Sequence, residues 1–260
     1  MRPRALVVRS GENPFPFAPE TSAIEIVEKV SHTVVPLSAG DERLDQPAQL
    51  AIFTSQIAVR RLFEESHLLS SFRAALQGGR IAAVGRATAN ALRERGLAVA
   101  VLAAGSAEAV LEKLPSRLEG WRVILPRGED AAEDLPEGLI RRGANVVPLV
   151  LYRKVPRPRD QDLDRDIVES PFAAFCATSP AAGRWLFTGI GEPALASLRR
   201  TPAVVLGRFT ARFLASHGVA RIEVAPEATF PAAAGLLVAL AREVPGSNLT
   251  DPAHRDHFEP

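Results

Sequence analysis

The chain has 260 residues, of which 47% are hydrophobic and 23% are charged, and its formal net charge is +1. This composition is typical of a globular protein with one large or two small domains. The near-neutral balance, without a basic stripe, argues against a nucleic-acid partner. No run approaches the roughly 20 apolar residues of a membrane span, and the start MRPRALVVRS is too short in apolar residues for a signal peptide. We therefore expect a cytoplasmic protein with no membrane partner.

In chain order, hydrophobic periodicity and breaker residues predict alternating strands and helices in the first half of the chain. The predicted elements are a strand at 5–8, a loop at 11–20, a helix at 22–29 with a Ser22/Glu25 capping box, strands at 33–37 and 50–53, a helix at 56–65, a strand at 81–84, a helix at 87–95, a strand at 99–102 and a helix at 106–114.

The second half of the chain predicts the same alternation. Its predicted elements are a strand at 123–125, a turn at 127–129, a helix at 134–142, a strand at 146–152, a loop at 153–162, a strand at 172–177, a helix at 180–187, a strand at 203–206, a helix at 210–216, a strand at 221–224, a helix at 231–242 and a disordered tail after residue 244. This alternation indicates an α/β fold with parallel sheets flanked by helices on both faces.

The alternation is a repeat. Residues 81–97 (IAAVGRATANALRERGL) and 203–219 (AVVLGRFTARFLASHGV) share an apolar run, a Gly-Arg turn and a helical pattern that ends at a glycine. Three further matches follow in the same order at similar spacing: 54–63 with 178–187, 4–9 with 122–127, and VVPL at 34–37 with VVPL at 146–149. Two copies of one α/β unit explain them better than a solenoid, which needs more and shorter repeats.

The pairs Thr54-Ser55 and Thr178-Ser179 each end a predicted strand and open a helix. Such a hydroxyl caps free helix N–H groups, a contribution of roughly 1 kcal/mol. The same N–H groups also form an anion site. Both interpretations stay open for each pair.

Four arginines directly follow strand ends, and two of them stand in the Gly-Arg-x-Thr turns at 85–88 and 207–210. In open α/β sheets, ligands bind beyond the carboxyl ends of the strands. One such arginine alone is typical of a solvated surface charge. Together the four arginines (Arg9, Arg86, Arg127 and Arg208) can receive several carboxylates or phosphates, since guanidinium binds both in a bidentate manner.

Other chemistry is poorly supported. Cys176 is the single cysteine and lies in the apolar run FAAFCA, which predicts a buried structural thiol. No Cys/His metal spacing, serine elbow, P-loop or G-x-G-x-x-G is present. Tyr152 is the only tyrosine, and it is either a packing aromatic or a phenolic proton donor at the ligand site.

Several stretches, in their order, resemble the uroporphyrinogen-III synthase family over roughly residues 45–240. They are FTSQIAV (53–59), AVGRATANALRERG (83–96), SAEAVLEKL (106–114), LPRGEDAAEDLPEGLIRRGANVVPLVLYRKV (125–155), the second Thr-Ser pair (178–179) and VLGRFTARFLASHGV (205–219).

The resemblance implies two similar flavodoxin- or Rossmann-like domains joined by a two-stranded linker. One domain would be discontinuous, 1–34 plus 157–244, and the other would be 41–146. The linker strands would be 35–40 and 147–156, with 245–260 as a disordered tail. The cleft between the domains would hold the substrate.

The family's lyase reaction closes linear hydroxymethylbilane to uroporphyrinogen III, with loss of water and inversion of ring D. It needs no cofactor and no metal, so the resemblance implies a small-molecule substrate, and we expect a monomer. Tyr152 matches the tyrosine proposed to protonate the leaving hydroxyl, and Thr88 and Thr210 match threonines of the cleft. The expected substrate-binding residues are Arg9, Thr54, Ser55, Gly85, Arg86, Thr88, Arg127, Thr178, Ser179, Gly207, Arg208 and Thr210.

The sequence also departs from the family. Residues 10–35 match poorly, and Phe209 stands where a small or polar residue is common, so it is expected to crowd the pocket. Two other hypotheses remain. One is a non-catalytic two-domain protein that senses a tetrapyrrole or another polycarboxylate. The other is a transferase using a nucleotide sugar, which the missing diphosphate motif disfavours.

Overall fold

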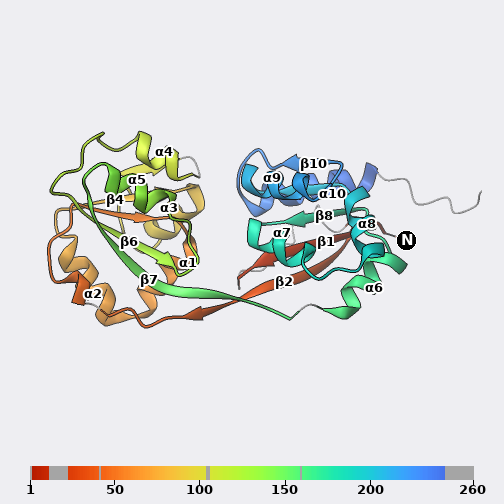
Figure 1. Ribbon diagram of the computed structural model, residues 1–260, viewed down its shortest axis with the longest axis horizontal. Coiled ribbons are helices and arrows are strands. Elements are labelled where there is room, and N and C mark those ends of the chain that lie inside the picture. Colours follow the sequence, from red (N-terminus) through yellow and green to blue (C-terminus); the bar gives the residue numbers. More distant parts are fainter. Residues whose placement is uncertain (1, 12–22, 41, 104–105, 159, 244–260) are drawn as a thin grey trace, which may run out of the picture. The chain divides into compact units, whose positions relative to one another are not determined.

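The computed structural model describes residues 2–11, 23–40, 42–103, 106–158 and 160–243. Its contacts divide the chain into two compact units (Figure 1). Unit 1 comprises Met1–His32 and Pro156–Pro260, and unit 2 comprises Thr33–Val155. Unit 1 is therefore discontinuous, and the chain passes twice between the units.

Unit 1 contains a parallel sheet in the order β10-β9-β8-β1-β2. Its elements are β1 (Arg4–Ser10), β2 (Glu25–Pro36), α6 (Gln161–Glu169), β8 (Ala174–Ala177), α7 (Pro180–Phe187), α8 (Glu192–Arg200), β9 (Ala203–Val205), α9 (Arg208–Ser216), β10 (Ile222–Val224) and α10 (Phe230–Glu243).

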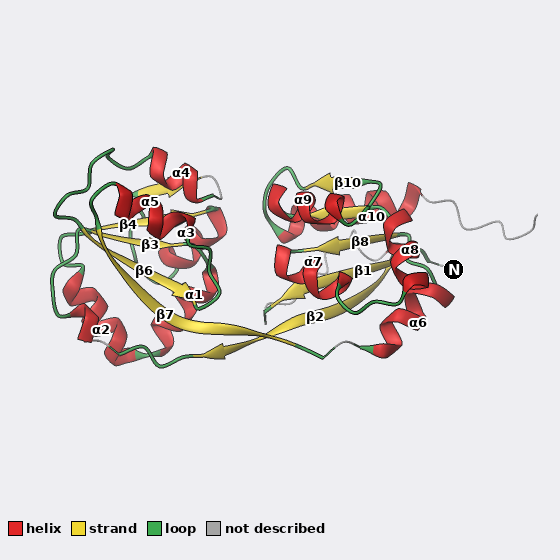
Figure 2. Cartoon of the chain, viewed as in Figure 1, coloured by secondary structure: helices red, strands yellow, loops and turns green. Residues whose placement is uncertain are grey.

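Side chains alternate across this sheet, as the pleat of a strand requires. On β1, Leu6 and Val8 belong to the hydrophobic core that includes residues of α6, α7, α8 and α9. Ala5 and Val7 belong to the core that includes residues of α10. Helices therefore cover both faces of the sheet (Figure 2).

Unit 2 contains a parallel sheet in the order β7-β6-β3-β4-β5. Its elements are η2 (Glu42–Leu44), β3 (Leu50–Phe53), α1 (Gln56–Glu64), α2 (Ser66–Ala75), β4 (Arg80–Val84), α3 (Arg86–Arg93), β5 (Val101–Ala103), α4 (Ala107–Glu112), β6 (Arg122–Gly128), α5 (Asp134–Arg141) and β7 (Asn145–Pro156). Ala51 and Phe53 pack with residues of α1, α2 and α3, whereas Leu50 and Ile52 pack with residues of α4 and α5.

The two sheets confirm the predicted repeat, because each strand of one unit has a counterpart in the other. In unit 1, β1 pairs with β2 and the register shifts between Arg9 and Ser10. In unit 2, β6 pairs with β7 and the register shifts between Arg127 and Gly128. The α/β fold class and the similarity of the two units were thus correctly predicted.

The strands β2 and β7 are neighbours in the strand order, and each continues past a unit boundary, so the predicted two-stranded linker stays a prediction that they would fit. Within unit 2, the Leu37 N–H donates to the Leu151 carbonyl at 3.0 Å. Within unit 1, the Arg157 N–H donates to the Ser31 carbonyl at 2.9 Å.

The predicted helix at 22–29 is wrong, because Glu25–Pro36 forms the single long strand β2. Ile26 and Val27 pack on opposite faces of the sheet, and parallel pairing with β1 satisfies their backbone groups. The partner β1 is a separate element that a local pattern cannot reveal. The capping-box pattern at Ser22 and Glu25 therefore gave a wrong prediction. Ser22 itself lies outside the described residues.

The two VVPL segments are not equivalent, contrary to the sequence interpretation. Ala5 pairs with Ile26 in unit 1, and its counterpart Val123 pairs with Val146 in unit 2. The structural counterpart of Val146 is therefore Ile26, and the tetrapeptide match is a coincidence.

Three helices were missed. The helices α2 and α8 lie in stretches without an assigned element, and α6 begins inside the predicted loop at 153–162. The Asp160 side chain caps α6 by accepting the Asp162 N–H at 3.0 Å. These helices are short, and tertiary packing stabilises them more than propensity does. The predicted loop at 11–20, apart from Gly11, and the predicted tail at 245–260 lie outside the described residues.

Cys176 is fully buried on β8, as predicted, and burial raises the pKa of its thiol to about 12. Where the structure describes the chain, no helix has the length and apolar character needed to cross a bilayer. In the same residues, no group of three His, Cys, Asp or Glu side chains is placed to hold a metal ion.

The core of unit 2 can be tested at Phe72, which is fully buried and packs edge-on against Phe53 with ring centroids 5.8 Å apart. We expect Phe72→Ala to lower the free energy of unfolding by about 3–5 kcal/mol, because it leaves a cavity. Urea denaturation measures this change. Ile140→Ala, at an exposed side chain, is the control and should change it by less than about 0.5 kcal/mol. Equal effects of the two changes would contradict the assigned core.

Candidate active site

Tyr152 lies on β7 with only 4% of its surface exposed. Its phenol oxygen is 3.0 Å from the Ser55 hydroxyl oxygen. Ser55 is also the N-cap of α1 and accepts the Ala58 N–H at 3.1 Å. One hydroxyl therefore both caps the helix and contacts the phenol. The capping interpretation of Ser55 is confirmed, and the anion site stays a prediction.

The position of the Tyr152 ring depends on Gly128. The register shift between β6 and β7 pairs these two residues directly. A Cβ atom added at Gly128 would lie 2.8 Å from the Tyr152 ring and 3.1 Å from an Asp130 carboxylate oxygen. Because real Cβ atoms do not approach this closely, glycine is required for the observed ring position. The Glu129 N–H also donates to the Tyr152 carbonyl at 2.8 Å.

The phenol of Tyr152 stays protonated at neutral pH. Burial raises its pKa above the ordinary value of 10, and the hydrogen bond from Ser55 partly opposes this shift. The negative charge of Asp130 raises the pKa further, whereas the positive charge of Arg127 lowers it. The group is therefore suited to donate a proton and not to remove one.

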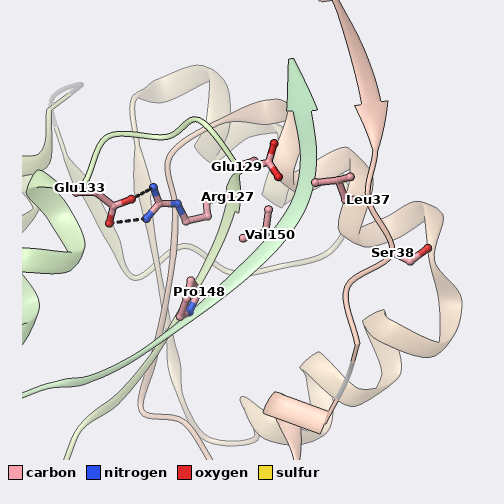
Figure 3. A pocket seen from close by; sticks show the side chains of 7 residues that line it. All are labelled: Leu37, Ser38, Arg127, Glu129, Glu133, Pro148 and Val150. Carbon is pink, nitrogen blue, oxygen red and sulfur yellow. Dashed lines mark hydrogen bonds and ion pairs between the residues drawn. The ribbon is translucent and has the colours of Figure 1, made fainter. Parts of the chain in front are cut away.

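Arg127 is buried at the end of β6 and its charge is already paired. It contacts Glu133 at 2.6 Å and donates to the carbonyls of Gly128, at 3.4 Å, and Ala131. Figure 3 shows Glu133 facing the guanidinium of Arg127. These contacts hold the loop that follows β6 in place.

Arg9 is the counterpart of Arg127 at the end of β1, and it is buried in the same way. It pairs with Glu28 and donates to the carbonyl of Gly11. Both buried arginines thus bind the backbone just after their strand, as well as a carboxylate of their own unit.

Arg86 and Arg208 differ from this first pair because both are exposed, at the starts of α3 and α9. Two residues further, Thr88 and Thr210 are buried at 4% and 3% exposure. The two Gly-Arg-x-Thr turns therefore point a threonine inward and an arginine outward in each unit.

The glycines of these turns have different roles. Gly85 has φ 83° and ψ 149°, a conformation that is essentially limited to glycine. Gly207 has φ −166°, which is extended backbone that any residue adopts. The turn in unit 2 thus depends on its glycine more strongly than the turn in unit 1.

In unit 1, Ser179 caps α7 by accepting the Ala182 N–H at 3.1 Å, and its hydroxyl lies 3.2 Å from that of Ser10. Ser179 is the counterpart of Ser55, but Ser10 is the counterpart of Gly128 and not of Tyr152. Of the neighbouring threonines, Thr178 is half-buried and its N–H donates to Val8 at 3.0 Å, whereas Thr54 is exposed.

His32 was not recognised from the sequence. The register shift in unit 1 pairs Ser10 with His32, as that in unit 2 pairs Gly128 with Tyr152, so the imidazole stands at the counterpart position of the phenol. Its Nδ1 lies 2.8 Å from the Ser31 hydroxyl, which donates to the Arg9 carbonyl at 2.9 Å. That serine has one proton, so Nδ1–H is the donor to it. The repeat spacing gave no signal for it, because Arg127 follows Arg9 by 118 residues whereas Tyr152 follows His32 by 120.

A pocket of about 540 Å³ lies within unit 2 beside β7 (Figure 3). Its two glutamates outnumber its one arginine, which is already paired, so it is unsuited to a polycarboxylate. It is lined by Leu37, Ser38, Arg127, Glu129, Glu133, Pro148 and Val150.

The parallel sheets gather the other candidate residues by unit. Residues 54–55 and 85–88 follow the adjacent parallel strands β3 and β4, so they lie beside each other at the carboxyl ends of the unit 2 strands. Residues 178–179 and 207–210 follow the adjacent strands β8 and β9 in unit 1. The fold and these groups define a two-unit α/β protein whose strand ends carry hydroxyls, helix N–H groups and exposed arginines.

Comparison with known proteins agrees with this class. A family model described as "Uroporphyrinogen-III synthase HemD" matches residues 19–235. A "Putative uroporphyrinogen-III synthase" of Methanothermobacter thermautotrophicus is 32% identical over 183 residues, covering 66% of this chain and 71% of that protein. A "Uroporphyrinogen-III synthase" of Chlorobaculum parvum is 26% identical, covering 58% of this chain and 62% of that protein. The chain belongs to the uroporphyrinogen-III synthase family.

Two solved structures share the fold. A mutant uroporphyrinogen III synthase of Thermus thermophilus aligns with a TM-score of 0.65 at 21% identity, covering 92% of this chain and 99% of that one. The Helicobacter pylori uroporphyrinogen-III synthetase aligns with a TM-score of 0.61 at 18% identity, covering 92% and 100%.

The environment of Tyr152 can be measured directly, because it is the only tyrosine. We expect ultraviolet titration of tyrosinate to give a pKa above 10, since burial disfavours the charged phenolate. Ser55→Ala should raise this pKa further, because it removes the hydrogen bond that lowers it. Thr54→Ala, at the exposed neighbour, is the control. With circular dichroism confirming the fold at each pH, a pKa at or below that of free tyrosine would contradict the site.

Proposed function

We propose that the protein is a uroporphyrinogen-III synthase, which converts hydroxymethylbilane to uroporphyrinogen III with loss of water and inversion of ring D. The observation that carries this proposal is the buried, protonated phenol of Tyr152. Tyr152 matches the tyrosine that is proposed as the proton donor in this family. The family match over residues 19–235 supports it.

In the first step, the Tyr152 phenol donates its proton to the leaving hydroxyl of the bilane. The carbon–oxygen bond then breaks, water leaves, and the electron pair of the pyrrole nitrogen forms an N-protonated azafulvene, whose positive charge balances the phenolate. The phenolate that remains is stabilised by Ser55 and by the charge of Arg127, the two groups that lower the pKa of Tyr152. The negative charge of Asp130 disfavours the phenolate, so it favours return of a proton to Tyr152.

Binding of the substrate requires compensation for its eight carboxylates. We assign this role first to the exposed guanidiniums of Arg86 and Arg208 and to the N–H groups of the helices that begin there. The buried Arg9 and Arg127 have carboxylate partners of their own. They would act by holding the loops that carry the site, a role they fill without leaving their ion pairs.

The second step, ring closure with inversion, depends on geometry more than on a further strong acid or base. The unassisted azafulvene closes without inversion, to the type I isomer. Holding ring D so that its substituted carbon attacks the azafulvene first gives a spiro intermediate. The bond from that carbon to the methylene of ring C then breaks, and the free carbon of ring D bonds to this methylene and loses its proton to the phenolate. Positioning of this kind can supply a large part of a barrier. The buried hydroxyls of Thr88 and Thr210 stand at the turns where the substrate would be held.

We further propose a small-molecule substrate, no nucleic-acid partner, no cofactor, a monomeric state and a cytoplasmic location. These proposals rest on the sequence and the family resemblance. The domain limits and the individual substrate-binding residues given above are proposals of the same kind.

The first test supplies fresh hydroxymethylbilane and separates the uroporphyrin I and III isomers after oxidation of the product. We expect the wild type to give mainly isomer III. Tyr152→Phe should lower kcat by about 100-fold, the contribution of one general acid, with Ile140→Ala as the unaffected control. Isomer I alone, at the rate without protein, would overturn the synthase proposal. Binding of the bilane without turnover would favour a non-catalytic sensor.

The exposed arginines are tested by Arg86→Gln and Arg208→Gln. Each should raise the KM for hydroxymethylbilane by about 5- to 30-fold with little change in kcat, because a charge-assisted contact of ~1–2 kcal/mol is lost. Arg141→Gln is the control, since Arg141 is exposed on α5 away from the strand ends. If the control raises KM equally, bulk charge explains the effect and the assignment fails.

A further inference from the structure

The two Gly-Arg-x-Thr turns differ at one position only, which is Ala87 in unit 2 and Phe209 in unit 1. Both turns are followed by a helix that begins at the arginine, and both bury their threonine. The turn therefore folds with alanine at this position. The phenyl ring of Phe209 is not needed to build it.

The ring of Phe209 is also not used for packing. It is 58% exposed, a value that Ile140 shares and that no other large hydrophobic side chain of the described residues exceeds. Burying a phenylalanine normally contributes about 1.5–3 kcal/mol, and this ring largely forgoes that contribution. An aromatic ring that the fold leaves exposed is available as a stacking surface for a ligand.

The charges around Phe209 indicate what that ligand carries. The guanidinium of Arg212, one helical turn further, lies over the ring at 5.9 Å from its centroid. Arg208, the preceding residue, is exposed as well. A flat apolar surface near two cationic side chains suits an aromatic ring with carboxylate substituents, because stacking and ion pairing then act together.

We propose that Phe209 is a substrate-binding residue whose ring stacks on one pyrrole of hydroxymethylbilane, while Arg208 and Arg212 bind the carboxylates of that pyrrole. The inference rests on the proposed function. It makes the two units unequal, because the counterpart Ala87 offers no such surface. Phe209 thus adds a contact at the strand end and does not merely crowd it.

The repeat supplies the variant that tests this role, since Phe209→Ala gives the turn of unit 1 the alanine that unit 2 has at Ala87. It should raise the KM for hydroxymethylbilane by about 3- to 10-fold, the effect of losing one aromatic contact, with kcat changed less than twofold. Phe209→Tyr keeps the ring and should restore KM, whereas Phe209→Leu should not. Ile140→Ala, which removes an equally exposed side chain, is the control.

A second measurement works without turnover. Uroporphyrin III carries the same eight carboxylates on pyrrole rings and is fluorescent, so its Kd is measurable for each variant. We expect Phe209→Ala to weaken its binding by a factor similar to the change in KM. An inactive wild type that still shows this difference would refute the synthase proposal and leave the stacking role standing.

Three results would overturn the stacking role. One is an unchanged KM and Kd in Phe209→Ala. Another is full affinity in Phe209→Leu, which would mean an apolar contact without stacking. The third is a change of oligomeric state in Phe209→Ala by sedimentation, which would assign the side chain to a protein interface.

Discussion

Parallel strand pairing is the constraint on which the rest of this structure depends. Because every described pair within the two sheets is parallel, the carboxyl ends of neighbouring strands meet at one edge of each unit. The helices α1, α3, α7 and α9 begin at these edges. Free N–H groups, capping hydroxyls and strand-end arginines are thereby gathered without any long-range sequence signal.

The repeat shows how one scaffold supports different chemistry in its two copies. Both units shift register at the same place in the sheet. At that place unit 2 carries a phenol held by Ser55, whereas unit 1 carries His32 beside Ser31. Glycine at Gly128 admits the larger ring, and its counterpart Ser10 instead forms a hydroxyl pair. The backbone is shared between the copies while the side chains at its strand ends have diverged.

Four arginines that look alike in the sequence fall into a buried pair and an exposed pair. Arg9 and Arg127 stand inside the register-shifted strand ends, where a carboxylate and backbone carbonyls satisfy them. Arg86 and Arg208 open helices at the surface. A buried guanidinium requires partners within the protein, whereas an exposed one can receive a substrate carboxylate. The partners Glu28 and Glu133 have no feature in the sequence that marks them.

The sequence by itself determined the alternation of strands and helices, the duplication, the buried thiol of Cys176 and the family. These properties follow from local periodicity and from repeated residues. Only the tertiary structure decided that Glu25–Pro36 is a strand, that Ser55 contacts Tyr152, that Arg127 is paired and that His32 is the counterpart of the phenol. Each of these depends on strand register or on an ion pair between separate elements, and local pattern cannot specify which distant residues parallel pairing brings together.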